Sequence, residues 1–339
     1  MLMKPKNHID IPKKKLGVLM VNLGTPEDTD FVNMWKYLRE FLSDRRIIEL
    51  TRVIWYPILY CIILIVRPKK SGKLYKAIWD KKKNESPLKV ITRSLSQKIQ
   101  RNFNPKKVKV SFAMNYGFPK IAEEMAVLKK EGCEKILIFP MYPQYSATTT
   151  ASVMDNLSKF MANQRWQPAI RLVPPYYDDE IYINALYLHI KKKLSNKMKQ
   201  TKKILCSFHG IPKKYFMKGD PYHCHCAKTV RLLGSKLKIN KIDIEMSFQS
   251  RFGPQEWLKP YMQEKMEEMI GKEVKELTVM APGFSVDCLE TLEEIKIQGK
   301  QEFLEMGGKT FNYIECLNDN EISVKMYLKI IKRELSGWM

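Results

Sequence analysis

Short apolar segments, many of them rich in β-branched residues, alternate with amphipathic stretches along most of this 339-residue sequence. Continuous apolar runs such as ILIF (136–139) and LTVM (277–280) are typical of strands that are covered on both faces. Strands that alternate with helices form right-handed βαβ units and therefore parallel sheets. The predicted strands comprise residues 16–22, 108–116, 135–140, 169–174, 203–208, 242–249, 276–281 and 311–315.

Eight strands in a chain of this length predict an α/β protein with two Rossmann-like lobes. Each lobe is expected to be a roughly four-stranded parallel sheet flanked by helices, with a cleft between the lobes. Amphipathic helices are predicted at 118–131, 179–194, 255–270 and 287–306. We divide the chain into a basic tail (1–15), an N-terminal lobe (16–165), a C-terminal lobe (166–315) and a C-terminal helix (316–339) that packs back on the first lobe.

Two segments echo each other: VNLGTP (21–26) and SFHGIP (207–212) both close a predicted strand with the pattern Gly-x-Pro. This echo indicates two related halves. In parallel α/β sheets, ligands bind beyond the carboxyl ends of the strands, so both segments are expected to face one cleft. No G-x-G-x-x-G or Walker sequence follows a predicted strand, so no sequence motif supports nucleotide binding.

The chain is strongly basic, with 59 Lys and Arg against 36 Asp and Glu and a net charge of +23. That charge suits nucleic acid, an anionic membrane surface or an acidic substrate. The sequence has no zinc-finger spacing, RNP-type aromatic motif or basic-zipper heptads, so we expect no nucleic-acid partner. Seven cysteines, an odd number, and a basic N-terminus without the apolar core of a signal peptide favour a reducing, cytoplasmic location.

The longest apolar run comprises residues 53–66 (VIWYPILYCIILIV), between Arg52 and Arg67. As a helix these fourteen residues would extend about 21 Å, whereas the hydrocarbon core of a membrane is about 30 Å thick. Pro57 also interrupts the run, and we predict no membrane span. Two interpretations stay open: a buried core helix, or an exposed apolar lip that contacts lipid or admits an apolar substrate. The basic residues that follow the run favour a lip on an anionic membrane. These residues are Arg67, Lys69, Lys70, Lys73, Lys76, Lys81, Lys82 and Lys83.

Histidine residues occur in two places that suggest chemistry. His209 directly follows the predicted strand 203–208, and Gly210 beside it permits close approach. A lone histidine is commonly structural, but the carboxyl end of a strand favours a functional site. The segment HCHC (223–226) gathers soft ligands that suit zinc or copper. Its crowded spacing cannot comfortably supply four ligands to one ion, and we favour a packed loop there.

An acidic stripe is predicted after the strand 276–281. At 100° per residue, the side chains of Asp287, Glu290, Glu294 and Gln298 fall on one narrow face of an α-helix. Such a stripe is ordinarily a solvated surface. A row of carboxylates can also capture a hard divalent cation, or relay protons where crowding raises the pKa of one of them.

Several short motifs follow one another in a fixed order along nearly the whole chain. They are GVLMVNLGTP (17–26), FLSDRRII (41–48), SPL (86–88), YPQYSATTT (142–150), SFHGIP (207–212), FQSRFGPQEWLKP (248–260) and the run from APGF to ETLEEI (281–295). In this order the motifs resemble the ferrochelatase family in its proteobacterial form. The resemblance implies a chelatase-type fold of two Rossmann-like lobes. It also implies insertion of Fe²⁺ into protoporphyrin IX to form protohaem, with release of two protons, as the last step of haem biosynthesis.

The resemblance also implies roles for individual residues. His209 matches the active-site histidine of the family and Glu290 its catalytic carboxylate, a pair that binds the metal, accepts the pyrrole protons, or does both. Glu294, together with Asp287, is expected on a path for protons or metal. The residues that match porphyrin-pocket positions are Leu23, Asn115, Tyr116, Gln249, Ser250, Trp257 and Phe284.

The sequence departs from the family pattern at several positions. Members with a [2Fe–2S] cluster carry a cysteine where this chain has Ala147, and no cysteine follows Cys316. We therefore expect no such cluster and no permanently bound cofactor. Asn115 occupies a position that is arginine in many relatives, which weakens the case for pairing with a propionate there. At the outer end of the acidic helix, Cys288 replaces a histidine of some relatives and Gln298 replaces a further acid.

The resemblance sets the expected partners. Protoporphyrin IX and ferrous iron are the substrates, and the expected location is the cytoplasm, at the inner face of the plasma membrane. Peripheral binding to its anionic surface and contact with the preceding enzyme of haem synthesis are part of this expectation. The alternatives are coproporphyrin as the substrate, a chelatase for another tetrapyrrole, and a non-enzymatic porphyrin or haem carrier.

Overall fold

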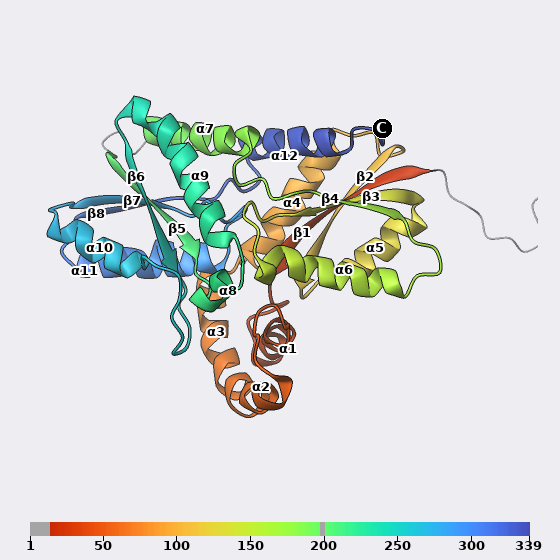
Figure 1. Cartoon of the computed structure of the whole chain (residues 1–339), viewed down its shortest axis with the longest axis horizontal. Helices are drawn as coiled ribbons and strands as arrows, with labels where there is room; N and C mark the ends of the chain where they lie inside the picture. Colours follow the sequence, from red (N-terminus) through yellow and green to blue (C-terminus); the bar gives the residue numbers. More distant parts are fainter. Residues whose placement is uncertain (1–13, 197–200) are drawn as a thin grey trace, which may run out of the picture.

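The computed structural model describes residues 14–196 and 201–339, which form two parallel four-stranded sheets (Figure 1). Most of the predicted basic tail, residues 1–13, lies outside the described residues. The first sheet has the order β2-β1-β3-β4 and consists of β1 (Lys15–Gly24), β2 (Val108–Tyr116), β3 (Cys133–Pro140) and β4 (Ala169–Leu172). The second sheet has the order β6-β5-β7-β8 and consists of β5 (Lys203–His209), β6 (Asp243–Gln249), β7 (Glu276–Met280) and β8 (Thr310–Ile314).

The two sheets share one topology, because the first strand of each lies between the second and the third. This arrangement confirms the predicted α/β fold of two related lobes, and each predicted strand is present within two residues at either end. The strand register determines which residues lie side by side at the carboxyl ends of the strands. Gly24 of β1 pairs with Tyr116 of β2, and His209 of β5 pairs with Gln249 of β6.

Helices lie on both sides of each sheet, and a separate group of helices projects away from them (Figure 1). The projecting group consists of α1 (Phe31–Leu42), α2 (Arg52–Ile58), the π-helix η1 (Leu59–Ile63) and α3 (Leu64–Ile78). The next helices along the chain are α4 (Pro87–Gln100), α5 (Ile121–Lys130), the π-helix η2 (Ala147–Ala151), α6 (Ser152–Ala162) and α7 (Glu180–Asn196). The remaining helices are α8 (Lys213–Met217), α9 (Tyr222–Leu237), the 3₁₀ turn η3 (Lys238–Asn240), α10 (Met262–Gly271), the π-helix η4 (Glu290–Gly299), α11 (Lys300–Glu305) and α12 (Glu321–Glu334).

Local sequence signals explain several helix boundaries. Ser86 caps α4 by accepting a hydrogen bond from the backbone of Lys89, and Pro87 occupies the first turn, where its missing N–H is not needed. Asn320 caps α12 in the same way. The helix predicted over 255–270 begins only at Met262, since Pro260 just before it cannot donate an intrahelical hydrogen bond.

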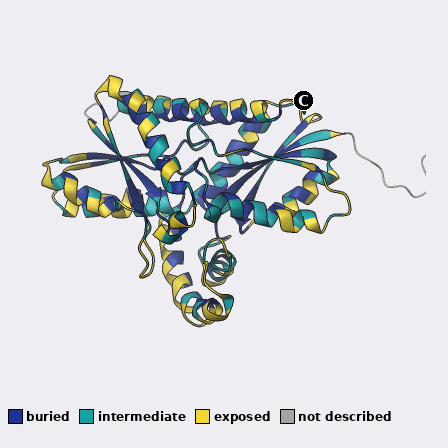
Figure 2. Cartoon of the chain, viewed as in Figure 1, coloured by how far each residue is buried: buried dark blue, intermediate teal, exposed yellow. Residues whose placement is uncertain are grey.

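The two lobes share one hydrophobic core. Val18 and Phe139 of the first sheet belong to the same buried cluster as Phe208 of the second. Tyr327 of α12 joins this cluster, and its ring lies 5.1 Å from that of Phe139. Helix α12 packs against both α4 and α7, so it connects the lobes along one side of the molecule (Figures 1 and 2). The shared core fixes the lobes as one body and leaves their strand ends facing each other.

The apolar run 53–66 forms α2, η1 and the start of α3. Its inward side chains, such as Leu59 and Leu64, are fully buried. Its outward side chains are not, and the exposed fractions of Val53 and Ile65 are 82% and 62%. The buried-helix interpretation is therefore wrong for the outer face of the run (Figure 2). Among the described residues, no helix has both the length and the apolar character needed to cross a membrane.

Candidate active site

His209 is the last residue of β5 and is half-buried. Its Nδ1 atom lies 2.6 Å from the carbonyl oxygen of Gly210, which can only accept a hydrogen bond. In the neutral ring Nδ1 therefore carries the proton, and Nε2 keeps a free lone pair. The ring centroid of Trp257 lies 6.4 Å from that of His209. This strand end thus presents one nitrogen that can bind a metal or accept a proton.

Gly210 allows the strand end to pack closely, as its position predicted. Its backbone N–H donates to the carbonyl oxygen of Gln249 over 2.8 Å. A Cβ atom at Gly210 would lie 2.9 Å from that same oxygen and 3.1 Å from the ring of Trp257. A larger residue would therefore push β6 or Trp257 away from His209.

Glu290 and Glu294 lie on the π-helix η4, not on the α-helix that we predicted over 287–306. A π-helix has a wider turn, so the predicted 100° per residue is wrong for this segment, although Glu290 and Glu294 do lie close together. Gln298, one predicted member of the stripe, is exposed and donates to the neighbouring Glu302 over 3.0 Å. π-Helices are rare and frequently occur at functional sites, which is consistent with an active site on this segment.

Asp287 precedes η4, and its carboxylate is occupied by protein donors. It accepts hydrogen bonds from the Tyr313 hydroxyl (2.6 Å), the Asn318 amide (2.7 Å) and the Thr291 hydroxyl (3.0 Å). These contacts attach the start of η4 to β8 and to the loop that follows it. The structure therefore places Asp287 as an anchor of the π-helix, apart from the stripe on which it was predicted.

Glu294 lies between β6 and the rest of η4. Its carboxylate accepts hydrogen bonds from the Ser250 hydroxyl and, over 3.1 Å, from the Gln249 amide. Burial raises the pKa of Glu294, the neighbouring Glu290 raises it further, and His209 acts in the opposite direction. Glu290 and His209 therefore both lie close enough to Glu294 for their charges to act on its carboxylate.

Side chains of the first lobe surround Glu290. Burial, and then the negative charge of Glu290, raises the pKa of Tyr37. Burial, followed by Tyr37 and Glu290, does the same for the pKa of Tyr75. Burial raises the pKa of the Cys288 thiol as well, with Glu290 as the next cause. All three groups therefore stay protonated and bring no charge of their own next to Glu290.

Comparison with known proteins assigns this architecture to a family. A family model described as Ferrochelatase matches residues 15–335. This chain belongs to the ferrochelatase family. Curated ferrochelatases of two rhizobia are similar to it over nearly their whole lengths. The Rhizobium etli (strain CIAT 652) protein is 49% identical over 99% of this chain and 98% of its own length. The Rhizobium meliloti (strain 1021) protein is 51% identical over 96% of this chain and 96% of its own length. This member of the family is thus a metal-inserting lyase, as predicted.

Solved structures share the fold of this ferrochelatase at much lower identity. SirB from Bacillus subtilis with Fe³⁺ has a TM-score of 0.58 at 10% identity and covers 96% of this chain and 97% of its own. CbiX, described as the terminal enzyme for biosynthesis of sirohaem in denitrifying bacteria, has a TM-score of 0.51 at 11% identity. It covers 94% of this chain and all of its own. These likenesses show a two-lobed chelatase fold.

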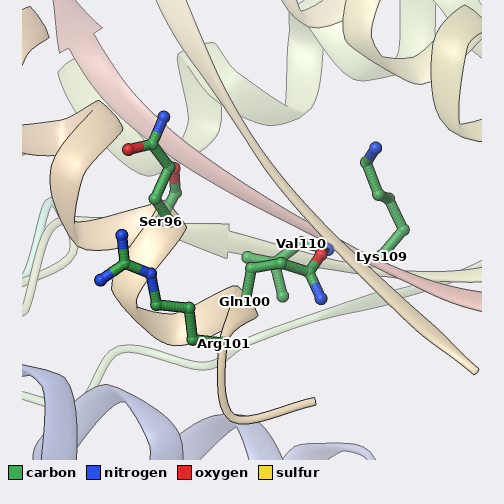
Figure 3. A pocket seen from close by; sticks show the side chains of 6 residues that line it. Ser96, Gln100, Arg101, Lys109 and Val110 are labelled. Carbon is green, nitrogen blue, oxygen red and sulfur yellow. Dashed lines mark hydrogen bonds between the residues drawn. The ribbon is translucent and has the colours of Figure 1, made fainter. Parts of the chain in front are cut away.

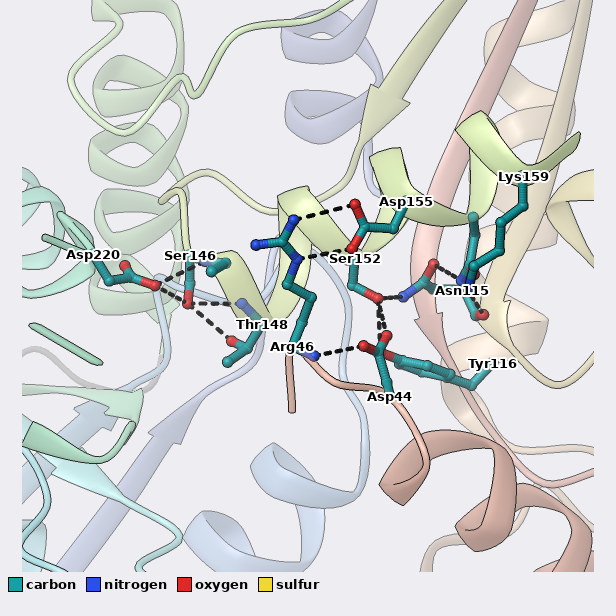
Figure 4. A network of polar contacts seen from close by, with 12 residues as sticks. Asp44, Arg46, Asn115, Tyr116, Ser146, Thr148, Ser152, Asp155, Lys159 and Asp220 are labelled. Atoms are coloured by element: carbon teal, nitrogen blue, oxygen red, sulfur yellow. Dashed lines mark hydrogen bonds and ion pairs between the residues drawn. The ribbon is translucent and has the colours of Figure 1, made fainter. Parts of the chain in front are cut away.

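Asn115 and Tyr116, at the carboxyl end of β2, belong to a polar network inside the first lobe (Figure 4). The Asn115 amide donates to Ser152 over 2.8 Å and accepts from Asn156 over 2.9 Å. The Tyr116 hydroxyl donates to the carboxylate of Asp44 over 2.7 Å. The polar ends of both residues are thus bound by the protein, and their predicted contact with a porphyrin stays a prediction.

The other predicted porphyrin contacts come from both lobes. Leu23 packs with the tyrosines that surround Glu290, on the first-lobe side. Phe284 lies at the edge of the core beneath η4. Trp257 donates from its indole nitrogen to the backbone oxygen of Phe252 over 2.8 Å. The remaining two, Gln249 and Ser250, hold Glu294, a role that the sequence did not suggest.

The segment HCHC (223–226) forms the first turn of α9, so the prediction of a packed loop is wrong. Cys226 is fully buried whereas Cys224 is exposed, and the two thiols therefore face different surroundings. The Nδ1 atom of His225 accepts a hydrogen bond from the backbone of Tyr145 over 3.2 Å. Within residues 14–196 and 201–339, no three His, Cys, Asp or Glu side chains are grouped as a metal site.

A hollow of about 330 Å³ lies on the first lobe, between α4 and the start of β2 (Figure 3). Two of its polar side chains are already paired: Gln100 bonds to the backbone of Val108 and Val110, and Lys109 to Glu131. The hollow lies at the amino end of β2, opposite the strand end that carries Tyr116. The strand end at His209, with Glu290 and Glu294 beside it, therefore remains the better candidate for the active site.

Sequence reasoning did not identify every residue that shapes this site. Tyr37 and Tyr75 surround Glu290, and Asp44 holds Tyr116. Ser207 donates to Gln249 over 2.6 Å. Asp44 and Ser207 belong to the motifs FLSDRRII and SFHGIP, which signalled the family but not these contacts. The two tyrosines lie on the buried faces of α1 and α3, and in the sequence they look like ordinary core residues of an amphipathic helix.

Proposed function

We propose that this ferrochelatase inserts Fe²⁺ into protoporphyrin IX, with His209 and Glu290 as its catalytic pair. The observation that supports this proposal is the convergence of His209, Glu290 and Glu294 at the carboxyl end of β5. The three residues come from two separate elements, β5 and η4. Ligands of parallel α/β folds bind at such strand ends.

Insertion requires that two pyrrole N–H bonds break while the iron gains the nitrogen lone pairs. In the proposed step, the free Nε2 lone pair of His209 accepts one pyrrole proton, and the electron pair of the broken N–H bond stays on the pyrrole nitrogen. The carboxylate of Glu290 attracts the cation and accepts the second proton. Glu294, whose pKa is raised, is a suitable next acceptor for a proton that leaves Glu290.

The surroundings of the pair support protoporphyrin over coproporphyrin as the substrate. Protoporphyrin carries two propionates and coproporphyrin four. Leu23, Tyr37 and Tyr75 give the first-lobe wall an apolar character, and the amide of Asn115 is engaged by Ser152 and so is not free for a propionate. An apolar wall binds the less charged ring better. We expect kcat/KM to favour protoporphyrin by about tenfold, which corresponds to about 1.4 kcal/mol.

The decisive experiment is anaerobic insertion of Fe²⁺, followed by the loss of porphyrin fluorescence, with both porphyrins. We expect rapid insertion by the wild type. Both His209→Ala and Glu290→Gln should lose at least about a hundredfold in kcat, the usual contribution of a positioned acid or base. Glu293→Gln is the matched control, because Glu293 lies on the same π-helix without a contact to His209 or Glu290 among the described hydrogen bonds.

Porphyrin binding and circular dichroism establish that each variant is folded. A folded wild type that binds porphyrin but inserts no iron would overturn the proposal in favour of a carrier. Rapid insertion of a different metal ion, with no insertion of Fe²⁺, would indicate a chelatase that is specific for that other metal. Full activity of a folded His209→Ala would remove His209 from the mechanism.

We also propose that the projecting helices rest on an anionic membrane surface. The exposed apolar face of 53–66 forms their tip, and the described lysines of α3 and of the turn after it are exposed beside it. Apolar side chains next to basic ones suit the interface of an anionic leaflet. A hydrophobic porphyrin would reach the cleft directly from such a surface.

A further inference from the structure

A narrow pocket lies directly behind Glu290, between the two lobes. It leaves room for about one water molecule. The first lobe contributes the loop after β1, part of α3 and the start of α4, and the second lobe contributes the residues just before η4. The pocket is lined by Gly24, Thr25, Tyr75, Ile78, Ser86, Pro87, Leu88, Cys288, Leu289 and Glu290.

Thr25 stands out among these residues. It is 1% exposed, and its hydroxyl oxygen has no hydrogen-bond partner among the described parts of the protein. A buried hydroxyl without a partner is unfavourable, and nearly every such group in proteins bonds to protein or to ordered water. The neighbouring Tyr75 does not meet this need, because its hydroxyl interacts with that of Tyr37.

Glu290, which is half-buried, also lines this pocket. Its described contact is with the thiol of Cys288, which is a weak donor. The stronger donor nearby, the amide of Gln249, bonds to the backbone oxygen of Glu290 and to Glu294. A carboxylate that is partly removed from solvent, as that of Glu290 is, is stabilised when further hydrogen bonds reach its oxygens. One water molecule in a pocket of this size has room to bond both to a hydroxyl and to a carboxylate that line it.

We propose that this pocket binds a single water molecule that bridges the Thr25 hydroxyl and the Glu290 carboxylate, and that Thr25 is thereby a positioning residue for metal insertion. The water accepts a hydrogen bond from Thr25 and donates one to Glu290. It holds one carboxylate oxygen at the rear, so that the other stays directed at the cleft. This inference deepens the proposed function, because it rests on the catalytic role of Glu290.

The variant Thr25→Val tests this role, because it keeps the shape of the side chain and removes the hydroxyl. We expect kcat for iron insertion to fall about tenfold, as for loss of a hydrogen bond to a charged group, with KM for the porphyrin unchanged. Thr25→Ser keeps the hydroxyl and should restore most of the activity. Thr278→Val changes another buried threonine, on β7 and outside the cleft, and should not alter kcat.

Crystal structures of the wild type and of both Thr25 variants test the water directly. We expect an ordered water within hydrogen-bond distance of Thr25 Oγ1 and Glu290 in the wild type and in Thr25→Ser, and none there in Thr25→Val. A wild-type crystal structure without this water would overturn the site. An unchanged kcat for Thr25→Val would overturn the positioning role. If the wild type inserted no iron, the proposed function would fail, whereas the crystal structures would still decide the water site.

Discussion

At the scale of single residues, burial decides what each histidine can do. His209 is half-buried and keeps Nε2 free, which suits proton traffic. His189 of α7 is buried and uses both nitrogens. Its Nε2 lies 2.9 Å from the carbonyl oxygen of Glu315, and its Nδ1 lies 3.3 Å from the amide of Asn320. A carbonyl accepts and an amide nitrogen donates, so the fold requires the neutral ring of His189 with its proton on Nε2.

This arrangement predicts a pH dependence of stability. Burial lowers the pKa of His189, while Glu315 raises it and Lys193 lowers it by smaller amounts. The stabilisation from neutral His189 is fully present above the unfolded pKa of about 6.5 and is lost as pH falls through the lower folded pKa. His189→Gln keeps a donor and an acceptor without titrating. We expect the difference in Tm between pH 7.5 and pH 5 to be smaller in this variant.

Thermal unfolding of the two proteins at both pH values checks this prediction. Some acid sensitivity will remain in the variant, because burial also lowers the pKa values of His223 and His225. An identical pH dependence in wild type and His189→Gln would show that His189 does not titrate on unfolding. Iron insertion by the variant should be normal at neutral pH, because His189 lies outside the cleft.

At the scale of elements, the sequence predicted the strands well and the helix at the site poorly. β1 and β5 are buried on both faces, so their side chains form continuous apolar runs that are visible in one dimension. The π-helix η4 has no comparable signature, because its apolar residues also fit an α-helical period over ten residues. Its geometry depends on Asp287, whose partners lie about thirty residues further along the chain. Such long-range contacts have no local pattern.

The anchoring of η4 can be tested at Asp287. Asp287→Asn keeps the size of the side chain but loses the charge that attracts the hydroxyl of Tyr313 and the amide of Asn318. We expect the free energy of unfolding to fall by about 2 kcal/mol, measured by urea denaturation. Iron insertion should fall along with stability, because the start of η4 shifts. Slower insertion at unchanged stability would instead support the predicted proton or metal path through Asp287.

At the scale of the whole molecule, the shared core and the candidate site lie on opposite sides of the molecule. The core lies on the side of α7 and α12, whereas Glu290 lies on the side of the projecting helices. The rings of Phe139 and Tyr327 pack between the lobes on the side of α7 and α12. Glu290 meets Tyr37 and Tyr75 on the side of the projecting helices. The helices that lead to the exposed apolar tip thus also form the wall behind Glu290. The same group of helices therefore carries the apolar tip and borders the candidate site at Glu290.

The last prediction concerns that tip. Val53, Ile62 and Ile65 are 82%, 59% and 62% exposed, and replacing all three with Ser removes apolar surface without touching the core. We expect flotation with vesicles of phosphatidylcholine and phosphatidylserine to fall more than about tenfold, while insertion of iron into detergent-dispersed porphyrin stays unchanged. Ile239→Ser, at an 83% exposed site on the second lobe, is the matched control and should still bind vesicles. Salt at 1 M should weaken wild-type binding, because the lysines contribute through their charge. Unchanged flotation of the triple variant would exclude the tip as the membrane contact and leave the charge alone to account for any binding.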